Sequence, residues 1–459
     1  MSTETLLHHG EWYLPHDPSN RLAGVLDCTS NDPLLTMHGE LPGHRPGSLI
    51  NDVSGAWGYH VPILLGRVVA GPLITLEDCY AVSSVGEMTG SLALFRYRPL
   101  RTYLGAHFHK TDELAFRVAT TELRNLRPWL GPPECLVRSG NRIEKSRLEP
   151  VTVTVGDATI TTHVQLLESW RPYETTFRDV AAFEITSATP LPVARWHEVY
   201  LQPLRNLLTL ATGSPSQHIR LNLAGDGANS VVQVIEAQGF GRAPTTRYRH
   251  AGEMLFAFAD LRDCWGEVLR RWLGLNERAS DALHLLFSVD YAPRMFVEHR
   301  FGNLVQALEV LHRRLRPEGS RQTESDRQRL ATIITACPPE HVRWLQEKLA
   351  FSHEPSLRDR VFELVDQAGS VIAPFVADPR QFAKKVADTR NYLTHRNPNV
   401  RKKSASMTEL WEYGFVLQIV LRVAVLHHIR EDIEWAKRVV TGTQEYQFQV
   451  GRIRLGQGT

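Results

Sequence analysis

The stretch that decides the fold is "PRQFAKKVADTRNYLTHRNP", residues 379–398. Asp378 precedes it, and an Asp-Pro pair is typical of a helix start: aspartate caps free backbone N–H groups and proline fits the first turn. The apolar residues at helical spacing are Phe382, Val386 and Leu393. Pro398 disfavours helical geometry just before it. The sequence therefore predicts a helix with one face in a core, ending near His395 to Arg396.

The chain around this stretch keeps the same helical character from about residue 260 onward. Each run places apolar residues three and four positions apart, and prolines lie near the boundaries. The runs cover residues 261–275, 276–289, 300–315, 339–351, 355–369, 379–395 and 407–439. Residues 312–329 mix acids with arginines, and we interpret them as a solvated connection between helices. The second half is predicted to be a helical bundle.

The first half has a different pattern, which is typical of β-structure. Short runs rich in Val, Ile, Leu and Thr within residues 60–82 are broken by Gly66, Gly71 and Pro72. Two alternating runs flank Gly156 and Asp157, which predicts a β-hairpin. One helix is expected at 193–212. We predict an α+β multidomain protein: a mostly β domain over 1–255, followed by an all-α bundle over 256–459.

Composition and cysteine usage indicate a globular protein of a reducing compartment. The chain has 459 residues, 42% hydrophobic and 22% charged, and a net charge of only +2, so overall charge does not argue for nucleic acid. The cysteines form no Cys-x-x-Cys pair, and we expect free thiols in the cytoplasm. They are Cys28, Cys79, Cys135, Cys264 and Cys337.

Membrane and metal partners are not expected. The N-terminus has no signal-peptide pattern. The most apolar stretch, residues 415–429, is interrupted by Gln418 and Arg422 and is shorter than the roughly 20 residues that span a bilayer, so a buried helix explains it better. His107 and His109 would share one face of a strand, but no third ligand is identifiable. We therefore predict no metal and no other cofactor.

Basic residues concentrate at the end of the quoted helix. Between residues 381 and 403 only Asp388 opposes them. They are Lys384, Lys385, Arg390, Arg396, Arg401, Lys402 and Lys403. Positive charge gathered around a cleft attracts phosphate backbones. Two interpretations stay open from the residues alone: a solvated basic helix end, or a site that handles a polyanion.

Arg390 and His395 are the residues of this segment that could carry chemistry. A histidine in the last turn lies at the negative end of the helix dipole, which favours its protonated form. The two residues are five positions apart, so their side chains diverge by ~140° on a straight helix. Either the helix end unwinds, or the two groups meet across a two-fold interface.

The segment "RNYLTH", residues 390–395, resembles the signature of the HEPN superfamily of helical-bundle ribonucleases. Its context, "DTRNYLTHRNP" followed by a long apolar helix, resembles the ApeA-like HEPN group in particular. The first half resembles the ApeA N-terminal domain through "GEWYLP" (10–15), "LLTMHGEL" (34–41) and "GRVVAGPLITLEDCYA" (66–81). Proteins of this type are prokaryotic anti-phage defence factors, so the resemblance implies a sensor or regulatory domain and a nuclease domain.

The resemblance implies a metal-independent endoribonuclease that cuts RNA by attack of the 2′-OH on the adjacent phosphate. His395 would be the general acid or base, Arg390 would hold the phosphate, and Asn391 would orient one of them. Residues for RNA binding would be Lys384, Lys385, Arg396, Arg401 and Lys402. A homodimer or higher homo-oligomer and a phage-derived trigger are also implied.

Two questions stay open. Many HEPN domains lack catalysis, so the alternative is a silent module that binds RNA or a nucleotide, or dimerises, and signals infection. Glu309 is either a surface partner of Arg313 four residues on, which we favour, or a partner of Arg390.

Overall fold

The computed structural model describes residues 6–29, 32–39, 41, 60–85, 94–131, 136–139, 142–145, 149–225, 231–237, 249–317, 322–396 and 398–455. The chain divides into two compact units, Met1–Arg205 with Ser216–Tyr248, and Asn206–Pro215 with Arg249–Thr459. The domain boundary expected after residue 255 stays a prediction. Helix α3 (Gln202–Thr212) begins in the first unit and ends in the second.

The first unit is mainly an antiparallel sheet, as predicted. Its strands are β1 (Leu7–Leu14), β2 (Asp17–Asp27), β3 (Leu34–His38), β4 (His60–Val68), β5 (Leu73–Val85), β6 (Leu94–Leu104), β7 (Ala115–Leu123), β10 (Val151–Val155), β11 (Ala158–Arg171), β12 (Glu174–Pro192), β13 (His218–Ala224) and β14 (Val231–Glu236). A separate hairpin pairs β8 (Leu136–Ser139) with β9 (Arg142–Lys145). Short helices α1 (Leu126–Trp129) and α2 (Val193–Trp196) accompany them.

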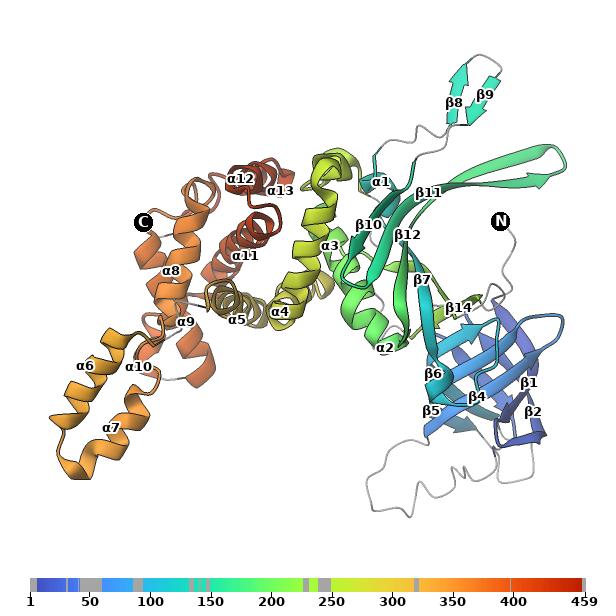
Figure 1. Cartoon of the computed structure of the whole chain (residues 1–459), viewed down its shortest axis with the longest axis horizontal. Helices are drawn as coiled ribbons and strands as arrows, with labels where there is room; N and C mark the ends of the chain where they lie inside the picture. The colour runs from blue at the N-terminus through green and yellow to red at the C-terminus, as the bar shows by residue number, and fades with distance from the viewer. Residues whose placement is uncertain are drawn as a thin grey trace. The chain divides into compact units, whose positions relative to one another are not determined.

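Six of these strands close into a barrel, drawn in blue in Figure 1. The order β6-β3-β2-β1-β4-β5 returns to β6, because β5 pairs with β6 over its length. Trp12 lies in the core and is fully buried. Gly66 on β4 faces its ring, and a Cβ there would lie 2.3 Å from Trp12 Cζ3. Gly66 therefore lies inside the strand as a packing position, not as the break that the sequence predicted.

The remaining strands extend the sheet from β6 in the order β14, β13, β7, β12, β11 and β10. The hairpin predicted around Gly156 and Asp157 is confirmed: Val155 pairs with Ala158, and Gly156 has a φ of +61°. The helix predicted at 193–212 is also confirmed, with a π-helical turn at His197–Leu201. His107 and His109 lie in the loop after β6, so their placement on one strand face was wrong.

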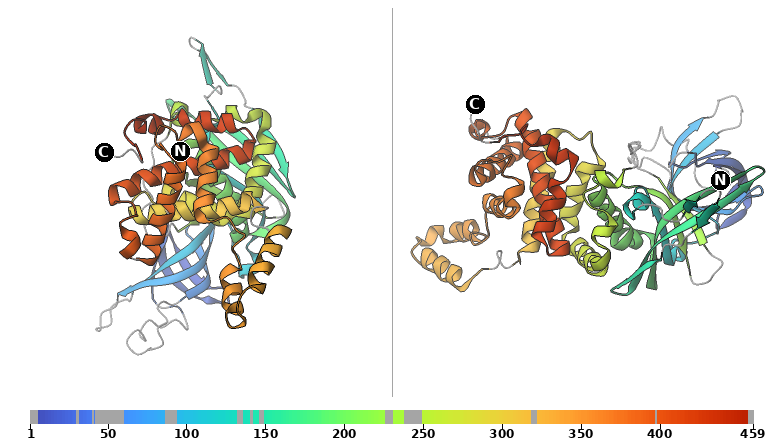
Figure 2. Two further views of the ribbon diagram at one scale, coloured as in Figure 1. Left: turned by 90° about the vertical axis from the view of Figure 1, so that its left-hand side faces the viewer. Right: turned by 90° about the horizontal axis from the view of Figure 1, so that it is seen from above.

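The second unit is helical, as predicted. Its helices are α4 (Trp265–Tyr291), α5 (Val297–Leu315), α6 (Glu324–Thr335), α7 (Val342–Leu349), α8 (Leu357–Ala368), α9 (Pro379–His395), α10 (Pro398–Arg401), α11 (Met407–Arg430), α12 (Ile433–Thr441) and α13 (Gln444–Gln449). The α6–α7 pair stands apart from the other helices of this unit in both views of Figure 2, and neither helix has a buried residue. The other long helices pack around α11, whose neighbours include α4, α5 and α8.

Three helical predictions needed correction. The runs 261–275 and 276–289 form one helix, α4, kinked at Ala279. The run 407–439 is divided by Glu431, which has a φ of +56°, and by Asp432, which caps α12. Helix α6 occupies part of the expected connection 312–329.

The predicted buried apolar helix and free thiols can be compared with the structure. Helix α11 is long and apolar enough to cross a membrane, but 78% of its most apolar window is buried inside the unit, as expected for a core helix. Four cysteines are free thiols, as expected: Cys28, Cys79, Cys264 and Cys337. Cys135 lies outside the described residues.

Candidate active site at the end of helix α9

Helix α9 has the bounds that its local signals predict. The Asp378 side chain accepts hydrogen bonds from the N–H groups of Arg380 and Gln381, which caps the helix. The ring of Phe382 stacks on Tyr413 of α11, with centroids 5.0 Å apart. The helix ends at His395, because Arg396 adopts the left-handed conformation with a φ of +51°. One end of α9 is therefore fixed in the core and the other carries the predicted site residues.

Arg390 is half-exposed and is held by two neighbours. Its Nη1 donates to Asn391 Oδ1 at 3.3 Å, and its Nη2 lies 3.8 Å from Glu309 Oε2 on α5. Glu309 Oε1 also lies 3.7 Å from Arg313 Nη2. Glu309 thus takes both of the roles left open by the sequence, as partner of Arg313 and of Arg390.

His395 is exposed, and within the described residues no group makes a hydrogen bond or ion pair with its ring. Helix α9 stays regular through His395, so the alternative in which the helix end unwinds was wrong. The Arg390 and His395 side chains therefore diverge by ~140° around the axis. A single copy of this helix holds both groups but does not direct them at one point.

Of the predicted RNA contacts, Arg396, Arg401 and Lys402 follow the end of α9, and Lys384 and Lys385 lie in its first half. Lys384, Arg396, Arg401 and Lys402 are exposed, and Lys385 is half-buried. The Arg396 guanidinium carbon lies 5.8 Å from the centroid of the Tyr392 ring. These side chains keep their charges at the surface, where a polyanion could reach them.

Thr389 is a site residue that the sequence reasoning missed. Its side chain is buried, its hydroxyl donates to the Lys385 carbonyl at 2.7 Å, and it accepts the Ala405 N–H at 2.9 Å. The Ser404 hydroxyl donates to the Arg401 carbonyl at 2.7 Å. The bond from Ala405 to Thr389 ties the segment after α9 back to the helix. The sequence pattern that could have identified Thr389 is a polar residue three positions after Val386, within the apolar stripe of the helix.

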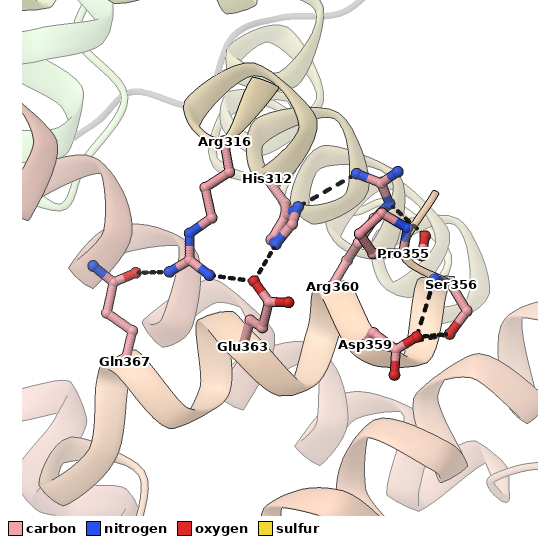
Figure 3. A network of polar contacts seen from close by, with 8 residues as sticks. All are labelled: His312, Arg316, Pro355, Ser356, Asp359, Arg360, Glu363 and Gln367. Carbon is pink, nitrogen blue, oxygen red and sulfur yellow. Dashed lines mark hydrogen bonds and ion pairs between the residues drawn. The ribbon is translucent and has the colours of Figure 1, made fainter. Parts of the chain in front are cut away.

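A second polar cluster lies inside the same unit, and Figure 3 shows it. His312 on α5 is buried; its Nε2 lies 2.9 Å from Glu363 Oε2, and its Nδ1 lies 3.3 Å from Arg360 Nη1. Because a guanidinium only donates, Nδ1 is the acceptor and Nε2 carries the proton. Arg316 also donates to Glu363.

This buried cluster reaches Arg390 through a chain of charges. Arg360 Nη2 donates to Glu354 Oε2 at 2.9 Å, and Arg313 Nη2 donates to the same oxygen at 3.3 Å. Arg313 is in turn paired with Glu309, the partner of Arg390. The prediction that residues 312–329 are a solvated connection was wrong for His312, because helix α8 packs over it.

The sequence predicted no metal site. In the described ranges, no group of three or more His, Cys, Asp or Glu side chains is placed to hold a metal ion.

Family models match both halves of the chain. The model for ApeA N-terminal domain 1 matches residues 7–272, and the model for Apea-like HEPN matches residues 303–432, which include Glu309, Arg390 and His395. No curated protein and no solved structure was found to match. The first model covers more than half of the 459 residues, and the two occur in the order expected of an anti-phage defence protein with a nuclease-type domain. The chain therefore belongs to the ApeA family, with an ApeA N-terminal domain followed by an Apea-like HEPN domain.

Proposed function

We propose that this protein is a metal-independent endoribonuclease with Arg390, Asn391 and His395 as its site. The observation that carries the proposal is the His395 imidazole, exposed and without a partner among the described residues, on the same helix end as Arg390 in a domain matched as HEPN. A structural histidine usually has its ring nitrogens satisfied, whereas a proton-transfer group must remain accessible.

The proposed reaction is a transesterification within RNA. The 2′-oxygen attacks the adjacent phosphorus, the bond from phosphorus to the 5′-oxygen breaks, and a 2′,3′-cyclic phosphate forms. A neutral His395 imidazole accepts the proton of the 2′-OH. A protonated His395 imidazole donates a proton to the leaving 5′-oxygen. Arg390 offsets the charge that develops on the phosphoryl oxygens, and Asn391 keeps its guanidinium in place. Cleavage requires the 2′-OH, so DNA is not a substrate.

We further propose that the active form is a homodimer or a higher homo-oligomer. Helix α9 is regular through His395, so Arg390 and His395 of one copy point in different directions. This supports the proposed oligomer. Two copies of α9 around a two-fold axis would place an arginine of one copy near a histidine of the other. The exposed side chains Lys384, Arg396, Arg401 and Lys402, with Lys385, would bind the flanking phosphates.

The test is RNA cleavage by the purified full-length protein in EDTA, followed by analysis of the product ends. We expect wild type to leave 2′,3′-cyclic phosphates and Arg390→Ala and His395→Ala to be inactive. His341→Ala and Arg343→Ala are matched controls, because both residues are exposed and lie near α7, away from α9 in the sequence. Cleavage that persists in both α9 variants, or that appears only with added divalent ions, would overturn the proposed site or its mechanism.

A silent binding module is the alternative, and one observation favours it. The Glu309 carboxylate already partners Arg390, and in that state the guanidinium is less available to a substrate phosphate. The alternative predicts that His395→Ala leaves RNA affinity and phage protection intact. An enzyme would instead keep RNA affinity and lose protection. An assay of plaque formation beside an RNA-binding titration separates the two outcomes.

Unrestrained RNA cleavage would harm the host cell, so we propose that the activity is triggered by a phage component in the cytoplasm. The N-terminal unit would receive that signal. If the purified protein is inactive, extract from phage-infected cells should activate wild type and leave His395→Ala inactive.

A further inference from the structure

The helical unit contains a polar cavity of about 300 Å³ that the proposed reaction does not use. It lies where the end of α4, the start of α5, the middle of α11 and the start of α13 meet. The side chains that matter for the argument are Asp290, Arg300, Gln418, Arg422 and Glu445. This volume is at the lower end of the range for small-molecule sites.

Arg300 has an unusual environment in this cavity. Its Nη2 donates to Gln418 Oε1 at 2.6 Å, and among the described residues no carboxylate lies within ion-pair distance of its guanidinium. Burial lowers the pKa of Arg300, although Asp290 and Glu445 act against this from farther away. A half-buried guanidinium is normally paired with a carboxylate or another anion, because removing its charge from water is costly.

Two more arginines line the cavity, Arg249 and Arg422, and Arg422 has the opposite arrangement to Arg300. Arg422 Nη2 lies 3.5 Å from Asp290 Oδ1, and Arg422 Nη1 lies 3.6 Å from Glu445 Oε2. Gln418 Nε2 also donates to Asp290 Oδ1, at 3.0 Å. Two carboxylates therefore share Arg422 while Arg300 faces only a neutral amide. The cavity offers one guanidinium that lacks a direct anionic partner beside carboxylate oxygens that can accept hydrogen bonds.

We propose that this cavity binds a small phosphate monoester that carries hydroxyl groups, that is, a sugar phosphate. The planar fork of Arg300 matches the geometry of phosphate oxygens. Hydroxyl groups on the body of the ligand would donate to Asp290. No aromatic side chain lines the cavity within the described part of the chain, so a stacked nucleobase is not the recognised element.

This site is separate from the end of α9. Arg300 and Glu309 both lie on α5 and are nine residues apart, which corresponds to ~14 Å along a helix. The inference therefore does not depend on RNA cleavage. Helix α5 nevertheless connects the two places, since Glu309 is the partner of Arg390.

The experiment is calorimetric titration of the full-length protein with ribose 5-phosphate, ribose, inorganic phosphate and AMP as probes. We expect saturable binding of ribose 5-phosphate, weaker binding of inorganic phosphate, and none of ribose. AMP tests whether the ligand is a nucleotide or a free sugar phosphate. If AMP binds as tightly as ribose 5-phosphate, the cavity accepts the ribose phosphate of a nucleotide. Weaker binding of AMP would identify a free sugar phosphate. Absence of saturable binding by every phosphate probe at millimolar concentration overturns the proposal.

Two variants with opposite expected effects distinguish binding from folding. Arg300→Gln should weaken binding of ribose 5-phosphate by about 10-fold or more, because it removes the charged fork. Glu445→Gln should strengthen binding about two- to five-fold, because it removes a nearby negative charge. Arg343→Gln is the control for Arg300→Gln, because it also removes one positive charge and its side chain on α7 is 93% exposed. Its affinity for ribose 5-phosphate should match that of wild type. Unchanged affinity in both cavity variants would overturn the assignment, even if Arg300→Gln alone folds poorly.

Discussion

The two histidine clusters of the helical unit contain the same kinds of side chain and differ in how they are satisfied. Around His312, both ring nitrogens have partners and the flanking arginines and glutamates pair with one another. Around His395, the ring is exposed without a partner among the described residues, and Arg390 has long, partly exposed contacts. The first cluster has the properties of a structural network, and the second has those of a site open to a ligand.

This difference shows that residue type alone does not identify a functional histidine. Both residues lie near the C-terminal ends of amphipathic helices and both have arginines as neighbours in sequence. What separates them is the helix packed over the ring, which is present for His312 and absent for His395. The following variants test whether the clusters differ in stability and activity as this interpretation requires.

Arg360→Ala should give the largest effect. Its side chain is 1% exposed and bonds His312, Glu354 and the Pro355 carbonyl, so its removal leaves buried groups without partners. We expect the free energy of unfolding to fall by about 3–5 kcal/mol. Urea denaturation of the helical unit measures it. Arg390→Ala is the matched variant and should lose under about 1 kcal/mol; equal losses would contradict the distinction between the clusters.

His312→Ala should lose more stability than His395→Ala. The difference should be smaller than that between Arg360→Ala and Arg390→Ala. Loss of the His312 ring leaves Arg360 and Glu363 each short of one hydrogen bond, which we expect to cost about 1–3 kcal/mol. His395→Ala should change the free energy of unfolding by no more than about 0.5 kcal/mol, as for an ordinary surface position. A large loss of stability in His395→Ala would show that its ring has a structural role.

Glu309→Gln tests the link between the clusters. The change removes the negative charge beside Arg390 and Arg313, so RNA affinity should rise by about two- to five-fold. The measurement is an RNA-binding titration at two salt concentrations, with Glu298→Gln in the first turn of the same helix as control. Weaker RNA binding in Glu309→Gln would mean that Glu309 positions Arg390 for RNA and does not compete with it.

The smallest expected effect is a loss of stability in acid at the buried His312 cluster. Burial lowers the pKa of His312 below its ordinary value of 6.5, although Glu363 opposes this; Arg316 and Arg360 add to the lowering. The unfolded chain then binds more protons, so the contribution of His312 to stability is present above pH 6.5 and is lost as the pH falls below it.

The cluster contains a second group that titrates in the same direction at lower pH. Burial alone would raise the pKa of Glu363, but its bonds to His312 and Arg316 outweigh burial and hold the pKa below 4.5, so that its contribution is lost below that pH. Urea midpoints of wild type and His312→Gln between pH 7.5 and 5.5 should therefore converge toward the acid end. Parallel curves would contradict the titration of His312.

The sequence predicted the parts of this molecule that local signals determine. Asp378, Pro379 and Pro398 set the bounds of α9, and Gly156 with Asp157 set a hairpin turn. Long-range pairing was not predictable in this way. Closure of the barrel needs β6 to pair with both β3 and β5, and the burial of His312 needs α8, which begins 45 residues later.

Two misses had a local signal that went unused. Helix α6 begins with a capping box, in which the Thr323 hydroxyl accepts the Asp326 N–H and the Asp326 carboxylate accepts the Thr323 N–H. Thr389 interrupts an apolar stripe with a hydroxyl, which a buried helix face tolerates only when the hydroxyl has partners. The pairing of Glu309 with Arg390, by contrast, joins residues 81 positions apart, and the sequence offered it only as the less favoured of two alternatives.

The left-handed conformation of Arg396 has a consequence for how this position evolves. Helices commonly end with glycine in that conformation, because a side chain there costs about 1–2 kcal/mol. A chain selected for stability alone would drift toward glycine here, and this one has arginine, the residue that follows His395. In the proposed ribonuclease, Arg396 marks a compromise between a stable helix end and a cation for a flanking phosphate of the RNA. Relatives without nuclease activity would be free of that constraint, so glycine at this position should accompany loss of the histidine proposed here as catalytic.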